Sequence, residues 1–141
     1  MKTVIKAALA TLLVCGAVLL VLGIVIWTES GDHERLVAVH VLIGIVLVFA
    51  LLVIAAIAWR TGVPAGTVAF AVGWGGLVVL LGLTQEDLVT GSLHWTIRVL
   101  HVAVSMGAIW WGRRLVKLIA RARSGGEPTL AHPPIASSAR N

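Results

Sequence analysis

The chain has 141 residues, of which 59% are hydrophobic and 12% are charged, and its formal net charge is +5. Soluble domains carry about a quarter charged residues, so this composition excludes a soluble globular enzyme, and the single cysteine excludes a disulfide scaffold. The Lys and Arg residues flank apolar runs instead of forming one basic face, a pattern typical of membrane topology, and we therefore expect no nucleic-acid partner.

Four apolar runs are each long enough to cross a bilayer as a helix. They cover residues 7–27, 36–59, 63–83 and 93–112. We therefore predict an all-α membrane protein, a four-transmembrane-helix bundle within residues 1–123. The first run also resembles the start of a signal peptide, but it is longer than the core of a cleaved signal, so we interpret it as a helix. The Ser, Gly and Pro residues of 124–141 predict a disordered tail.

The charges of the connecting segments predict the orientation of these helices. Lys2 and Lys6 precede the first run, Arg60 follows the second, and five Lys or Arg residues follow the fourth: Arg113, Arg114, Lys117, Arg121 and Arg123. The other two connections are acidic. Because positive segments stay inside, we expect both termini in the cytoplasm and a multi-pass protein of a bacterial-type inner (plasma) membrane.

Histidines form two matched pairs in the second and fourth runs. His33 and His40 are seven residues apart, and so are His94 and His101. Seven residues are nearly two helical turns, so each pair lies on one helix face, about 10 Å apart along the axis. Both runs have the same direction, which predicts that His40 and His101 lie at matching depth inside the membrane and can face each other.

Two facing imidazoles in a helical bundle point to bis-histidine ligation of haem iron, which we expect to be a single haem b with His40 and His101 as its metal ligands. Zinc and copper sites normally need three or four ligands close together. Hydrogen bonding between helices remains an alternative for these histidines, as does other metal or proton chemistry. The outer pair, His33 and His94, is expected to line the haem edge, a quinone site or a proton site, or to be ordinary interfacial residues.

Three other residues are candidates for the haem-binding site. Gly44 and Ser105 each follow one of the inner histidines by one turn and would leave room for a flat macrocycle, although membrane helices also use small residues to pack closely. Arg98 lies within the fourth run, three residues before His101. It can pair with haem propionates or extend to lipid headgroups.

The segment Val99-Leu100-His101-Val102-Ala103-Val104-Ser105-Met106 resembles the fourth helix of heme A synthase, and residues 34–60 are similar in pattern to its second helix. The resemblance implies one four-helix half of that enzyme, with His40 and His101 as haem ligands. The family motif Glu-x-x-His-Arg is not reproduced, because Glu34 precedes His40 by six residues and Val41 follows it. The implied ligands therefore carry over, and the enzymatic activity does not. Ser92-Leu93-His94-Trp95 also resembles a helix start in bacterial four-helix b-type cytochromes.

These observations favour a membrane cytochrome that exchanges electrons with membrane quinone or with respiratory membrane subunits, because iron with two histidine ligands leaves no position open for substrate. A heme A synthase-like haem-modifying enzyme and a haem-free accessory subunit of a membrane complex are the alternatives. Whether the chain is an enzyme stays open at this point.

Overall fold

The computed structural model describes residues 1–28, 34–88 and 93–124, with only the backbone for residues 85–87. This part of the chain is all-helical: α1 (Lys2–Thr28), α2 (Glu34–Arg60), α3 (Ala65–Leu88) and α4 (His94–Ser124). By length and composition, α1, α2 and the Ala65–Thr84 part of α3 are apolar enough to cross a membrane, whereas α4 is not among these candidates. The expected tail lies outside the described residues, except for Ser124, which ends α4.

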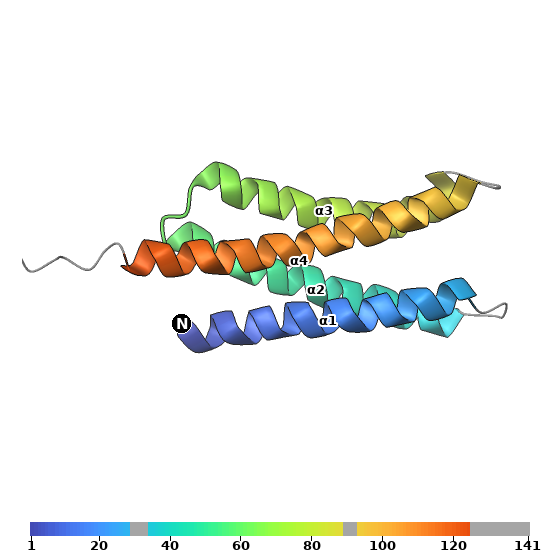
Figure 1. Ribbon diagram of the computed structural model, residues 1–141, viewed down its shortest axis with the longest axis horizontal. Coiled ribbons are helices and arrows are strands. Elements are labelled where there is room, and N and C mark those ends of the chain that lie inside the picture. The colour runs from blue at the N-terminus through green and yellow to red at the C-terminus, as the bar shows by residue number, and fades with distance from the viewer. Residues whose placement is uncertain (29–33, 89–92, 125–141) are drawn as a thin grey trace, which may run out of the picture.

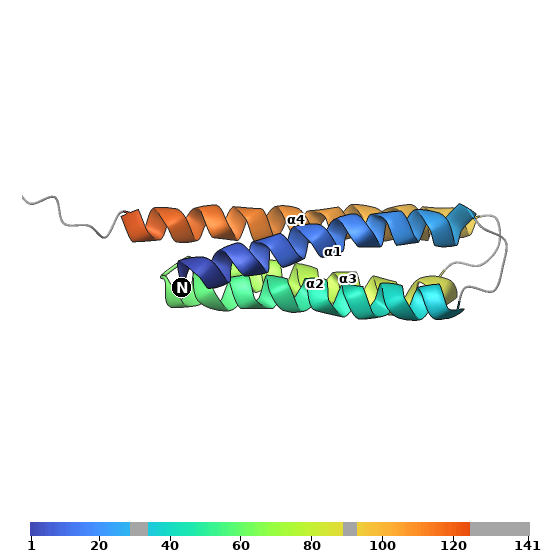
Figure 2. The same ribbon diagram turned by 90° about the horizontal axis from the view of Figure 1, so that it is seen from below.

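The four helices run alternately up and down in one elongated bundle (Figures 1 and 2). One end holds the start of α1, the α2–α3 connection and the C-terminal part of α4; we call it the basic end. The opposite end, where α2 and α4 begin, is the histidine end. Helices adjacent in sequence pack together, α1 also packs against α4, and α2 approaches α4 across the diagonal, whereas α1 and α3 do not meet. As the sequence predicts, α2 and α4 run in the same direction.

The fourth helix continues well beyond the expected boundary at residue 112. Hydropathy ends the predicted span where Arg113 and Arg114 begin, but Arg, Lys, Leu and Ala are all favourable residues in a helix, and α4 continues for a further three turns to Ser124. At its other end, His94, Arg98 and His101 reduce the apolar character of the helix. This explains why α4 does not reach the apolarity of the other three helices.

A tight connection joins α2 to α3 at the basic end. Val63 N donates to Ala58 O (3.1 Å) and Gly62 N donates to Trp59 O (3.2 Å), the hydrogen-bond pattern of a Schellman motif. Gly62 has a φ of 81°, a left-handed conformation that glycine adopts without a Cβ penalty. Pro64 follows and cannot continue α2, so α3 begins at Ala65 and not at the expected residue 63.

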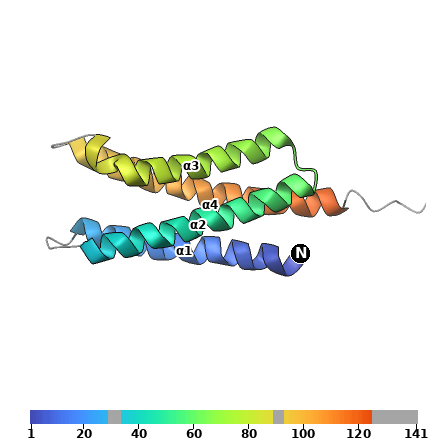
Figure 3. The same ribbon diagram turned by 180° about the vertical axis from the view of Figure 1, so that it is seen from behind.

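The buried core is concentrated at the basic end and in the middle of the bundle. Its largest fully buried side chains are Leu12, Leu47, Leu51, Ile54, Leu115 and Ile119. Toward the histidine end, no described residue is buried in α1 after Leu12, in α2 before Leu47 or in α4 before Val104, and only α3 continues its buried positions, to Leu81. In the same direction the α1–α2 pair draws apart from the α3–α4 pair (Figures 1 and 3).

Glycines allow close approach at the interfaces that α4 makes. Ile109 of α4 lies against Gly16 of α1, and Leu12 of α1 lies reciprocally against Gly112 of α4. Because a Cβ at either glycine would collide with the opposing side chain, these two contacts set the separation between α1 and α4. The packing role expected for small residues in membrane helices accounts for both positions.

An indole joins α3 to α4 at mid-bundle. Trp74 Nε1 donates to the carbonyl oxygen of Val104 at 2.8 Å. The indole lies over Gly107, where a Cβ would come within 2.6 Å of Nε1. Phe70 packs against Trp74 and also against Trp111, with ring centroids 5.7 and 4.9 Å apart. This aromatic cluster packs α3 against α4, between His101 and the basic end of the bundle.

Candidate functional site

The structure brings His40 and His101 together at the histidine end. His40 lies two turns into α2 and His101 two turns into α4, so the shared direction of these helices places both rings at the same depth. The ring centroids are 6.4 Å apart and the ring planes are inclined by 45°. Both side chains are half-buried. They therefore form a facing imidazole pair, which we call the histidine pair.

Each ring of the histidine pair has a buried nitrogen without a hydrogen-bond partner. The atoms are Nδ1 of His40 and Nδ1 of His101. Buried polar atoms are almost always satisfied, and an exception in a native structure requires an explanation. Two such atoms on two facing rings favour a ligand that the imidazoles would bind over a direct hydrogen bond between the helices.

The other two helices present glycines to the histidine pair. A Cβ on Gly23 of α1 would lie 3.7 Å from Cε1 of His40, and one on Gly82 of α3 would lie 3.2 Å from Cε1 of His101. All four helices thus contribute to this site. Neither position is among the site residues predicted from the sequence. The available signal was that both are glycines near the ends of their helices, at the depth of the histidines.

The remaining predicted site residues differ in how far they are exposed. Gly44 has no atom within 4 Å of its Cβ position and therefore faces open space. Ser105 is half-buried and Arg98 is exposed. His94 is half-buried at the start of α4 and has an interaction partner. The prediction for His33 lies outside the described residues.

The geometry of the histidine pair fits coordination of one metal ion from two sides. A metal–imidazole bond is about 2 Å long, so an ion midway between two imidazoles places the ring centres about 6–6.5 Å apart. The observed 6.4 Å agrees with this separation. Within the described residues there is no group of three or more His, Cys, Asp or Glu that could hold a metal ion. Among the described residues, the pair could thus supply two ligands to an ion at this position.

Comparison with known proteins adds no relative to this description. No family model, curated protein or solved structure matches the chain. A functional assignment must therefore be built on the histidine pair and its surroundings.

Proposed function

We propose that this chain is an integral membrane haem b protein in which His40 and His101 are the axial ligands of one haem, and that it transfers electrons to or from membrane quinone or a respiratory partner subunit. The observation that carries the proposal is the 6.4 Å separation of two facing imidazoles, each with a buried, unpartnered Nδ1. In this proposal all four helices cross the bacterial inner membrane and both termini are cytoplasmic.

The surroundings of the histidine pair are compatible with a flat macrocycle. The described residues of α1, α2 and α4 have no buried side chain at this depth, so a bound group would occupy the position that a core occupies at the basic end. Gly23 and Gly82 keep Cβ atoms away from the outer edges of the two rings. Arg98 is exposed, one turn before His101, and is available to a propionate.

The residues have distinct roles in this proposal. The two imidazoles would hold the iron, and two histidine ligands would leave no coordination position for substrate, which suits electron transfer. When bound, the haem supplies reversible one-electron chemistry. A membrane position would bring the bound haem within reach of a lipid-soluble quinone.

Single substitutions of the histidine pair test the proposal. We expect the purified wild type to show the visible bands of a reduced low-spin haem b, and His40→Ala and His101→Ala each to lose haem or to give five-coordinate, high-spin spectra. His132→Ala, in the chain beyond α4, is the matched control and should keep the wild-type spectrum. Far-UV circular dichroism of each variant checks that the helices persist.

Two results would overturn this assignment. Wild-type low-spin bands in both histidine variants would show that these residues are not the ligands. Purified wild type that contains no haem, and takes up none when haem is added, would favour the haem-free accessory subunit.

A further inference from the structure

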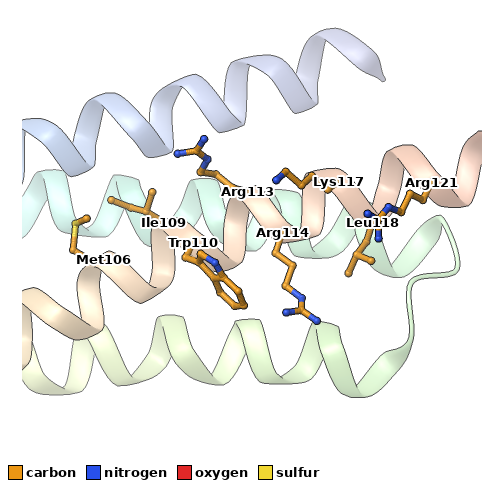
Figure 4. A pocket seen from close by; sticks show the side chains of 8 residues that line it. All are labelled: Met106, Ile109, Trp110, Arg113, Arg114, Lys117, Leu118 and Arg121. Atoms are coloured by element: carbon orange, nitrogen blue, oxygen red, sulfur yellow. The ribbon is translucent and has the colours of Figure 1, made fainter.

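A second candidate site lies on the outward face of α4, more than a turn beyond the histidine pair toward the basic end. A shallow surface pocket of about 480 Å³ is lined by α4 alone, and Figure 4 shows the side chains that line it. Its lining residues are Met106, Ile109, Trp110, Arg113, Arg114, Lys117, Leu118 and Arg121. Nothing in the haem proposal uses these side chains.

The pocket changes character along its length. Its first part is apolar, formed by Met106, Ile109 and Trp110, and its second part is cationic. The change falls at residue 112, where the sequence predicts the apolar span to end. Arg113, Lys117 and Arg121 follow one another at intervals of four residues, which places three cations on one face over about 12 Å of helix. All three are exposed.

These cations have no acidic counterpart on their own helix. The sequence of α4 contains no Asp or Glu, and five of the six acidic residues of the chain precede it, in or next to the two connections of the histidine end. The guanidinium of Arg114 is held over the Trp110 and Trp111 rings, 5.1 and 5.3 Å from their centroids. In Figure 4, Trp110 and Arg114 point to the α3 side of the helix, whereas Arg113 points to the α1 side. Within α4 the pocket therefore joins a cationic surface without a carboxylate to an apolar one.

We infer that this pocket binds the headgroup of an anionic phospholipid. The phosphate lies against Arg113, Lys117 and Arg121, and the acyl chain runs along Met106, Ile109 and Trp110. Cations at the membrane surface attract anionic lipid, and basic pockets on the cytoplasmic side of membrane helices bind such headgroups. The order of apolar and cationic side chains along α4 is the order of acyl chain and phosphate in a phospholipid. This inference is independent of the haem proposal.

Lipid retention by the purified full-length protein tests the inference. The probe is phosphatidylglycerol, with phosphatidylcholine as the neutral comparison, and bound lipids are counted by native mass spectrometry after detergent extraction. The test variant is Arg113→Gln/Lys117→Gln/Arg121→Gln. The matched control is Lys2→Gln/Lys6→Gln/Arg60→Gln, which removes the same number of exposed charges at the same end of the bundle but outside the pocket.

We expect wild type and control to retain phosphatidylglycerol equally within about twofold, and to prefer it over phosphatidylcholine. The pocket variant should retain at least about tenfold less phosphatidylglycerol. The inference is wrong if the control loses as much lipid as the pocket variant, because the attraction is then a general property of surface charge. Equal retention of the two lipids by wild type also overturns it. If the triple variant does not fold, the single variants Arg113→Gln and Lys117→Gln give the same comparison, each against Arg60→Gln.

Discussion

Histidine is an unusual residue at the depth where His40 and His101 lie. Ionisable side chains inside a membrane span are costly, and they generally face the protein interior and serve a function. Here Gly23 and Gly82 present no side chain to the rings, and each ring has an unpartnered Nδ1. Packing alone would be served equally well by Leu, so the ligand that we propose would account for the cost of these imidazoles.

Because Gly82 lies close to His101, we expect a single added methyl group at Gly82 to weaken haem binding. In Gly82→Ala the new Cβ would lie 3.2 Å from Cε1 of His101, closer than ordinary van der Waals contact, so the ring must shift by a few tenths of an ångström. If His101 is a ligand, we expect a cost of about 1 kcal/mol, which is about fivefold in haem affinity. Haem titration followed by absorbance measures it.

Gly76→Ala is the matched control, since Gly76 lies on the same helix and its Cβ position has open space. It should bind haem as the wild type does. Unchanged affinity in Gly82→Ala would contradict the ligand position that we assign to His101.

Among the helices, α4 combines three different segments. Its first two turns carry the polar residues of the candidate site, its middle packs against all three other helices, and its last turns are basic. Hydropathy predicts the first two of these segments, which lie within residues 93–112, but not the last. The extension to Ser124 depends on helix propensity, which is weak evidence in sequence because tertiary context often overrides it.

The reciprocal contacts between α1 and α4 predict strong coupling between Leu12 and Gly112. In Gly112→Ala the added methyl collides with Leu12, and overpacking of this kind costs about 1–3 kcal/mol of the free energy of unfolding. Leu12→Ala leaves a cavity and costs about 2–5 kcal/mol. The loss of the free energy of unfolding in the double variant should be smaller than the sum of the two single losses by about 1 kcal/mol or more. The new methyl partly fills the cavity that Leu12→Ala leaves.

Thermal unfolding in detergent, followed by circular dichroism, measures this cycle. Gly66→Ala serves as the control, since its Cβ position is open. Strict additivity of the two substitutions would show that Leu12 and Gly112 do not share the contact.

For the molecule as a whole, the distribution of charge predicts the topology. Most basic residues of α1, α2 and α4 lie at one end of the bundle, and the exceptions are Arg35 and Arg98 near the histidine end. The N-terminus of the chain and the last turn of α4 lie at the basic end (Figure 1). A reporter that is active only in the periplasm should therefore stay silent when fused after Asn141. The same reporter inserted between residues 89 and 92 should be active. Activity of the first fusion would reverse the orientation.

The spacing between the outer and inner histidines also limits the number of haems. His94 is seven residues from His101, about 10 Å along the axis of α4, and a macrocycle is of similar size, so a second haem there would collide with the first. We expect one haem per chain from haem extraction and amino-acid analysis, and the same ratio in His94→Ala. A ratio near two would show that the outer pair forms a second site.

The sequence predicted the number, order and direction of the helices, because each apolar run is long and separated from the next by charged residues. It also predicted that His40 and His101 lie at the same depth, since equal offsets on two helices of the same direction give equal depth. It could not predict Gly23 and Gly82 as neighbours of the rings, because the rotation of one helix about its axis relative to another depends on side-chain packing. The sequence did not predict the pocket on α4 either. Its cations served only to predict the orientation of the helices, because the pocket depends on which side chains share one helix face.

Because the core is concentrated at the basic end, a small change in the angle between the helices there displaces the histidine end by a larger distance. His40 is seven residues beyond Leu47, the first buried residue of α2, and this is an arm of about 10 Å. A tilt of about 5–6° between the two hairpins at the packed layer would therefore move one imidazole relative to the other by about 1 Å, which is half the length of a metal–nitrogen bond. The distance between the imidazoles is thus governed by the angle at which Leu47, Leu51 and Ala108 pack, well away from the histidines themselves.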